Sequence, residues 1–191
     1  LQKSFDNDFS KSDLWDGNAK NTNWSGNGSF NSPYLIQSAG DLAGLQQQVS
    51  KSNNYNEKFF LLTVDIDLNH FSWNPIGNSI DHFQGNFDGN NHVIGNLNIT
   101  QLSDFSGLFG YLQNSNIFNL TVKCDLKNFG KYNGAISGYM INVTLINVHV
   151  IGNIEGLEFT GGFAGFCDCV SMKNVYFEGK INGRNNTGGL A

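Results

Sequence analysis

Charged residues and arginine are scarce in this 191-residue sequence. Only 14% of the residues are charged, the formal net charge is -5, and Arg184 is the single arginine. Nucleic-acid binding needs clustered lysine and arginine to neutralise phosphates, so this composition argues against a nucleic-acid partner. No apolar run approaches the roughly 20 residues that span a bilayer, which argues against direct membrane insertion.

Cysteine pairs and metal-binding spacings are also missing. Cys124, Cys167 and Cys169 are odd in number and fit no zinc-binding spacing, so a disulfide framework is not expected. We expect packed thiols, with an intermolecular link as the alternative. No two histidines are spaced i, i+2 or i, i+4 as metal ligands would be, and no serine lies in a G-x-S-x-G sequence. The sequence therefore predicts no metal, no cofactor and no catalytic residue.

Glycine, asparagine and aromatic residues are abundant instead. The chain has 23 glycines, and 13% of its residues are aromatic. Glycine and asparagine readily adopt the left-handed backbone that tight corners need, so this composition favours strands and turns over helices.

A phrase recurs along the C-terminal half of the chain. It opens at Gly107, Gly134, Gly162 and Gly189, which are 27, 28 and 27 residues apart. A fixed period in this range is typical of a solenoid, in which each unit buries its apolar face by stacking on the next. The final "TGGLA" repeats the beginning of "TGGFAG" (160–165), so we expect further coils beyond Ala191.

Apolar residues alternate within each repeat, as in Leu120 and Val122 or Val148 and Val150. Alternation with a period of 2 indicates strands, so the sequence predicts an all-β fold. Short strands in a unit of about 27 residues describe a parallel β-helix, with coils stacked at roughly 4.8 Å.

Asparagine recurs at one place in the repeat. Asn119, Asn147 and Asn174 open "NLTV", "NVHV" and "NVYF". Asparagine tolerates the left-handed conformation, and its amide can bond to the coils above and below. We therefore interpret these residues as a structural column.

The front of the chain differs from the repeats. Residues 1–33 are polar and are predicted to form a leader or cap segment, followed by a β-helix over 34–191. Ser38 and Asp41 form a capping-box variant ahead of Leu42, Leu45 and Val49, which share one helix face. We therefore predict a capping helix near 40–50, lying across the open end of the coils.

Seven short motifs occur in one order: "W-S-G-x-G", "PYLI", "DLAGL", "VDIDL", "W-x-PIGN", "FDGNNHVIGNLNI" and the "GLFGYL" to "GGFAG" phrases. This order, from about Trp24 to Ala191, resembles the β-helical modules with GLUG-type repeats. Such modules occur in large bacterial surface and secreted proteins, including regions near the immunoglobulin A peptidases and in adhesins. The resemblance implies an extracellular right-handed β-helix and no catalytic set. "GAISG" (134–138) and the Cys167–Cys169 pair depart from the pattern.

Two groups of residues are candidates for chemistry or recognition. Asp65 and Asp67 share one strand face in "VDIDL", where they could form an acid pair, although hydrogen bonds to nearby corners explain them equally. Exposed aromatics can stack on sugars or on partner side chains. We list four tyrosines as candidate ligand-binding residues: Tyr111, Tyr132, Tyr139 and Tyr176.

The sequence therefore predicts a non-catalytic, extracellular β-solenoid module of a bacterial surface protein. It would act in adhesion or as a stalk or scaffold, and a host glycan, a surface protein or other domains of the same polypeptide would be its partners. The alternative is a polysaccharide-active β-helix enzyme, a lyase or a hydrolase, whose site involves Asp65, Asp67 or the coils expected beyond Ala191.

Overall fold

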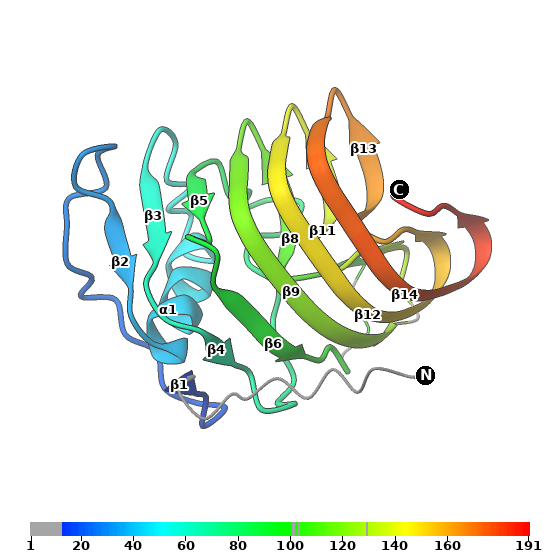
Figure 1. The fold of residues 1–191 in the computed structure, drawn as a ribbon, viewed down its shortest axis with the longest axis horizontal. Helices are drawn as coiled ribbons and strands as arrows, with labels where there is room; N and C mark the ends of the chain where they lie inside the picture. Colours follow the sequence, from blue (N-terminus) through cyan, green and yellow to red (C-terminus); the bar gives the residue numbers. More distant parts are fainter. Residues whose placement is uncertain (1–12, 101, 103, 129) are drawn as a thin grey trace.

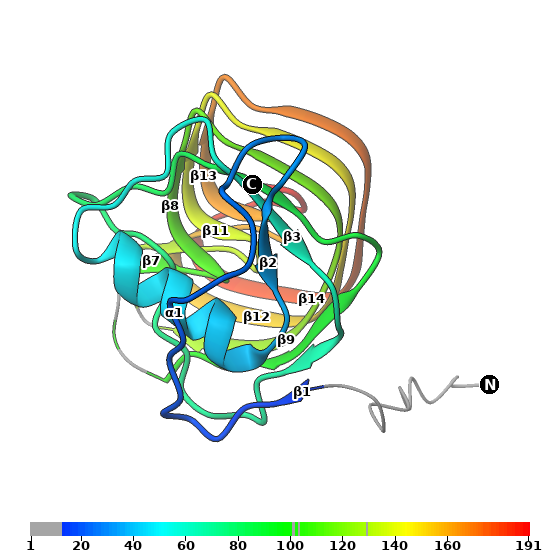
Figure 2. The same cartoon turned by 90° about the vertical axis from the view of Figure 1, so that its left-hand side faces the viewer.

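The structure, a computed structural model, describes residues 13–100, 102, 104–128 and 130–191. Strands account for 51% of the chain and wind into a parallel β-solenoid of about 6 turns, with about 27 residues in each coil. Figure 1 shows the coils side by side, from β2 at the N-terminal end to β14 at the other. Seen from the N-terminal end in Figure 2, the chain runs clockwise as it recedes, so the winding is right-handed. The predicted fold class is confirmed.

Parallel strands from successive coils form the walls. The first wall contains β2 (Tyr34–Ile36), β3 (Phe59–Leu62), β5 (Asn86–Asp88) and the beginnings of β9 (Asn116–Asn128), β12 (Thr144–Thr160) and β14 (Ser171–Thr187). The second contains β1 (Asp13–Leu14), β4 (Ile66–Asp67), β6 (Val93–Leu97) and the later parts of β9, β12 and β14. The third contains β8 (Phe109–Gln113), β11 (Ser137–Ile141) and β13 (Ala164–Asp168). Two short strands, β7 (Phe105–Ser106) and β10 (Tyr132–Asn133), pair beside the end of β12.

Apolar side chains pile up in register inside the coils. Val148 pairs with Leu120 on one side and with Val175 on the other. Leu120 and Val148 are buried, and Val175 in the last coil is half-buried against the same core. Each fully buried side chain of this size contributes about 1.5–3 kcal/mol, so the stacked coils account for much of the stability.

The later strands are longer than the short strands that the sequence suggests. β12 and β14 each extend over 17 residues and bend from the first wall into the second. Gly152 and Gly179 lie paired within these strands at φ of 153° and 146°. A Cβ atom at Gly152 would come 1.8 Å from the Cys124 carbonyl oxygen, so only glycine allows the coils to approach this closely.

The predicted helix is present as α1 (Ala39–Val49). The Asp41 backbone N–H donates to Ser38 Oγ at 3.0 Å, which caps the first turn as the sequence predicts. Leu42, Leu45 and Val49 are completely buried. α1 lies across the N-terminal end of the coils in Figure 2. Its buried apolar side chains belong to the same core as those of the first coils, such as Ile36 and Leu62.

The back of α1 is covered as well. A Cβ atom at Gly44 would come 1.8 Å from the Asn21 carbonyl oxygen, and the Asn21 N–H donates to the Gly40 carbonyl at 2.8 Å. The sequence predicts a single apolar face, but small residues on the other face allow the preceding segment to pack directly on the helix.

Residues 13–33 pack on the solenoid. β1 pairs with β4, although β2 and α1 lie between these strands in the chain. Trp15 is 6% exposed and makes an edge contact with Trp73 at 5.5 Å between ring centroids. Residues 1–12 of the predicted leader lie outside the described residues.

Candidate functional site

The asparagine column forms a ladder of side-chain hydrogen bonds. Asn147 Nδ2 donates to Asn119 Oδ1 at 2.9 Å, and Asn174 Nδ2 donates to Asn147 Oδ1 at 3.0 Å. Asn119 Nδ2 extends the ladder to Asp88 Oδ1 at 3.0 Å. The three asparagines have φ between 48° and 55°, the left-handed region that asparagine tolerates. Their amides are therefore engaged in fixing the corner.

A second, shorter ladder lies at another corner. Asn142 Nδ2 donates to Asn114 Oδ1 at 2.8 Å, and both residues have φ of 52°. Cys169 occupies the next position of this column at φ 53° and is exposed. Its thiol donates to Asp168 Oδ1 at 3.3 Å, which raises the pKa of Cys169.

The other two cysteines are more enclosed. Cys124 is buried and Cys167 is half-buried, and all three thiols are free. Burial raises the pKa of Cys124 to about 12 and that of Cys167 to about 11, so both are protonated at neutral pH.

Asp65 and Asp67 hold corners of the chain. Asp65 Oδ1 lies 2.9 Å from His92 Nδ1 and accepts the Val93 backbone N–H at 3.0 Å. Asp67 is 8% exposed, and its Oδ1 accepts from the Asn69 N–H and from Asn96 Nδ2, both at 2.7 Å. The bond from Asn69 closes a local turn, and the bonds from His92, Val93 and Asn96 join neighbouring coils, which is the structural interpretation of the pair.

No candidate metal cluster accompanies these carboxylates in the described part of the chain. There, no three His, Cys, Asp or Glu side chains gather closely enough to hold a metal ion.

One outer wall carries a stack of aromatic rings along the solenoid axis. Tyr111 stacks on Tyr139 at 4.9 Å between centroids, and Tyr139 stacks on Phe166 at 4.4 Å. His82 continues the stack beyond Tyr111 at 4.2 Å. These rings come from one position in successive coils, since β8, β11 and β13 pair in register.

A second aromatic stack lies beside the first. Phe105 stacks on Tyr132 at 5.3 Å, and Tyr132 stacks on Phe159 at 5.1 Å. Tyr132 meets Tyr139 edge to face at 5.1 Å, which joins the two stacks. We call these seven residues the aromatic trough: His82, Phe105, Tyr111, Tyr132, Tyr139, Phe159 and Phe166.

The two aromatic stacks of the trough depend on close backbone contact between the chain segments that carry them. A Cβ atom at Gly138 would come 2.6 Å from Phe105 Cα, and one at Gly165 would come 2.4 Å from the Asn133 backbone nitrogen. Glycine at both positions therefore brings the second stack against the first.

Stacking determines which parts of these rings a ligand could reach. Both faces of the Tyr139 ring are covered, one by Tyr111 and the other by Phe166. A sugar binds an aromatic ring through the ring face, so the middle of the stack offers only ring edges and hydroxyl groups. Burial, with a contribution from Tyr139, raises the pKa of Tyr111, so its phenol stays protonated.

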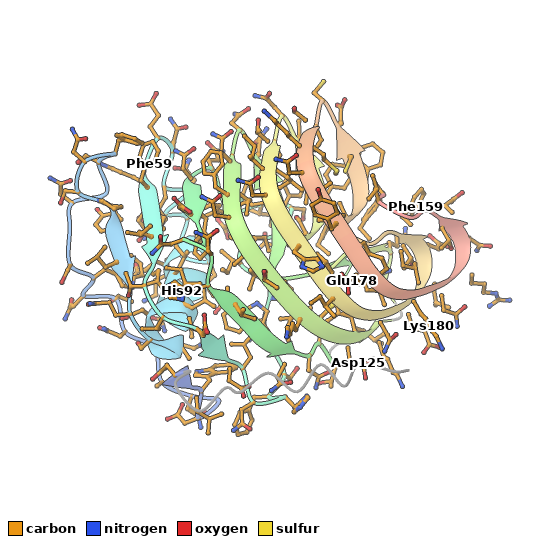
Figure 3. The ribbon with its side chains drawn as sticks, viewed as in Figure 1. Phe59, His92, Asp125, Phe159, Glu178 and Lys180 are labelled. Carbon is orange, nitrogen blue, oxygen red and sulfur yellow. The ribbon has the colours of Figure 1, made fainter. Side chains whose placement is uncertain are left out.

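The C-terminal end of the trough is hollowed. Phe159 and Phe166, the last rings of the two stacks, line a hollow of about 440 Å³ together with Cys167 and residues 186–188. Figure 3 shows Phe159 at the end of the solenoid near β14.

Tyr176 lies apart from the other three candidate tyrosines. It is on β14, is 63% exposed, and pairs with His149 on β12. His149 Nε2 lies 3.2 Å from Glu178 Oε1 on the same wall, where Figure 3 labels Glu178. The structure therefore brings together Tyr111, Tyr132 and Tyr139, and places Tyr176 on a different wall.

Sequence reasoning missed four trough residues: His82, Phe105, Phe159 and Phe166. The repeat contains a signal for three of them. Phe105, Tyr132 and Phe159 are 27 residues apart, and Phe166 lies 27 residues after Tyr139. A search for aromatic residues at the repeat period would have found both stacks.

Two relatives are similar to this chain. Halomucin from Haloquadratum walsbyi is 35% identical over 155 residues, which cover 74% of this chain and 2% of that protein. A protein of Evansella cellulosilytica named as a Gly-rich membrane protein is 30% identical over 108 residues, covering 52% of this chain and 12% of that protein. The chain thus spans a small fraction of the length of these relatives.

No known family matches the chain, and no solved structure is significantly similar to it. Within the described residues, no helix is long and apolar enough to cross a membrane.

Proposed function

We propose that this chain is a non-catalytic β-solenoid module of a surface protein, and that it acts as a stalk or scaffold for other parts of its polypeptide. The main support is the in-register pairing of β9, β12 and β14. Each coil is joined to the next by backbone bonds, side-chain ladders and a continuous core. About 6 turns at roughly 4.8 Å each give a stiff rod ~29 Å long.

The relatives support a surface or membrane-associated setting, because one is named Halomucin and the other a membrane protein. This chain matches 2% and 12% of their lengths, as a module within a long polypeptide would. We propose an extracellular location and a kinship with GLUG-type repeat modules, on the motifs quoted above. Further domains of the same polypeptide would be its first partners.

The carboxylates support a non-catalytic role. Asp65 and Asp67, the residues on which a polysaccharide-active enzyme would depend, both bind neighbouring corners. Both residues use Oδ1 for these bonds, and Asp67 is 8% exposed, so little of that carboxylate is open to a substrate. Loss of either side chain should therefore lower stability first.

Adhesion is the second candidate function, and the aromatic trough favours it. The trough places seven half-buried aromatic residues on one outer surface. Aromatic residues are enriched in the surfaces through which proteins bind their partners. A partner, a glycan or a surface protein, would meet ring edges and hydroxyl groups along the trough. Loss of binding in Tyr139→Ala, compared with Tyr176→Ala on the other wall, would test this role.

A cell-surface spacer assay tests the stalk. The chain is placed between a membrane anchor and a fluorescent protein, and the distance distribution to a membrane dye is measured by energy transfer. A Gly-Ser linker of about 28 residues, whose root-mean-square length is also ~29 Å, serves as the comparison. We expect a narrow distribution for the solenoid and a broad one for the linker.

The matched control is Val148→Asp, which puts an unpaired charge into the core ladder and should broaden the distribution. A native chain that gives a distribution as broad as the linker would contradict the stalk function.

A further inference from the structure

A second hollow lies at the N-terminal end of the solenoid, at the opposite end from the hollow beside Phe159 and Phe166. It has a volume of about 450 Å³, within the ordinary range of ligand pockets. We call it the cap hollow and define it by its lining residues: Thr22, Asn23, Trp24, Tyr34, Gln48 and Tyr55. Three separate segments supply them: the loop before β2 with the first residue of β2, the last turn of α1, and the loop after α1.

The three aromatic rings of the cap hollow rest on one buried side chain. Phe60 is 1% exposed, and its ring centroid lies 5.5 Å from Trp24, 5.3 Å from Tyr34 and 5.1 Å from Tyr55. Trp24 Nε1 donates to the Asp41 carbonyl at 3.2 Å. The rings are thus fixed before any ligand arrives, which reduces the entropy lost on binding.

These rings are arranged differently from those of the trough. Trp24 meets Tyr34 at 56° and Tyr55 at 66°, and Tyr34 meets Tyr55 at 78°. None of the three is stacked in parallel with another, whereas every tyrosine of the trough is stacked. Ring surface is therefore left at the cap hollow for a ligand to contact.

The loop that carries Tyr55 is held in an unfavourable conformation. Ser52, Tyr55 and Glu57 have φ of 67°, 57° and 59°. Bulky non-glycine residues rarely adopt positive φ, at a cost of roughly 1–2 kcal/mol for each residue. Such strain persists where the surrounding structure imposes it, and it concentrates at functional sites. Here it brings the Tyr55 ring to the hollow.

The lining determines the chemistry of the ligand. The lining contains no Asp, Glu, Lys, Arg or His, and burial raises the pKa of Tyr55 to about 12, which keeps its phenol protonated. The lining offers two amides and three hydroxyl groups, two of them on the tyrosine rings, so hydrogen-bonding groups lie next to aromatic surface. Neutral sugars have this pattern of hydroxyl groups around apolar C–H faces. An anionic ligand would find no cation in the lining, and a purely apolar ligand would cover polar groups of the lining without offering them hydrogen bonds.

We propose that the cap hollow is a binding site for neutral oligosaccharides. The site is independent of the stalk function, because a rigid spacer needs no ligand and a ligand site needs no rigid spacer.

Titration of the whole chain with cellotetraose, mannotetraose, laminaritetraose and tetragalacturonate tests this site. Tryptophan fluorescence reports binding, because Trp24 is half-buried at the hollow while Trp15 and Trp73 are in the core. We expect at least one neutral tetrasaccharide, and not the acidic one, to change the fluorescence. Tyr55→Ala should weaken that binding at least tenfold.

Two further variants separate binding from folding. Asn23→Ala removes an exposed amide from the lining and should weaken binding with an unchanged melting temperature. Tyr176→Ala removes an exposed aromatic residue of the last coil and should bind like the native chain. The site is refuted if no neutral tetrasaccharide binds at concentrations up to about 10 mM. Tighter binding of the acidic probe, or equal binding by Tyr55→Ala and Tyr176→Ala, would also overturn it.

Discussion

Replacement of Asn147 by alanine isolates what the asparagine ladder contributes to stability. The side chain donates to Asn119 Oδ1 at 2.9 Å and accepts from Asn174 Nδ2 at 3.0 Å, so the substitution removes two hydrogen bonds. Because Asn147 is exposed, each bond is worth about 0.5 kcal/mol, the lower end of the usual range. Alanine at φ 55° costs about 1 kcal/mol more, since its Cβ disfavours the left-handed region. We expect a total loss of about 2 kcal/mol.

Two companion variants separate these contributions. Asn147→Gly loses the same two bonds but accepts positive φ, so it should cost less than Asn147→Ala. Asn174→Ala has nearly the same backbone strain at φ 53° but loses one ladder bond, the one that Asn174 donates to Asn147. It should therefore be about 0.5 kcal/mol milder than Asn147→Ala.

Urea denaturation, followed by tryptophan fluorescence and by circular dichroism, measures the three free energies of unfolding. Coincident transitions and equal slopes are required, because stacked repeats can unfold in parts. If glycine at position 147 proves as destabilising as alanine, the backbone explanation of the column is refuted. If all three variants match the native chain, the ladder itself has no energetic role.

Three other perturbations have defined outcomes. Gly152→Ala should lower the free energy of unfolding, measured in urea, by at least about 2 kcal/mol because its Cβ atom would meet the next coil. Gly189→Ala is the control and should be neutral, since nothing lies within 4 Å of a Cβ atom there. Equal effects of the two substitutions would contradict this close packing. Burial of Cys124 raises its pKa from 9.0 to about 12, so its contribution to stability is complete below pH 9 and is lost as the pH rises toward 12. At pH 10 the native chain should have lost about 1.4 kcal/mol through this thiol, and Cys124→Ala should lack that part of the pH dependence. Asp67→Ala should lower the free energy of unfolding by about 3–6 kcal/mol, because it removes two charge-assisted bonds of about 1.5–3 kcal/mol each. The exposed Asp125→Ala should leave the stability unchanged. If Asp67→Ala instead keeps the native stability and alters polysaccharide cleavage, the enzyme alternative is favoured.

The repeat made the fold predictable because a corner with positive φ recurs at the same place in successive coils. Asn119, Asn147 and Asn174 lie at equivalent positive-φ corners, so the chain uses the same residue type three times. The helix was predictable for a local reason, since Ser38 caps it directly. In contrast, β1 lies in the polar N-terminal segment and pairs with β4, more than fifty positions later in the chain. No local sequence pattern distinguishes the two residues of β1, Asp13 and Leu14, from a loop.

The candidate site was predictable only in part. Tyr111 and Tyr139 hold equivalent positions in the repeat, so their stack follows from the period. The contact of Tyr132 with Tyr139 depends on how far the chain folds back between β10 and β11, which glycine spacing alone does not determine. The cap hollow is lined by three segments that are brought together by the packing of α1 on the coils, and no repeated pattern in the sequence predicts it.

Regular and irregular parts of this solenoid therefore suit different tasks. In the coils, the stacked aromatic rings and the ladder asparagines each meet a residue of the same kind in the next coil, so ring faces and amides are engaged within the wall. The contacts that make such a wall rigid also occupy the ring faces and amide groups that a ligand would otherwise contact. At the N-terminal end the repeat is interrupted by α1 and by the segment that covers it. Trp24 and Tyr55, which gather around Phe60 with Tyr34, come from loops outside the repeated strands, and their polar neighbours include Gln48 and Asn23. A rod built in this way is best equipped for recognition where its repetition stops.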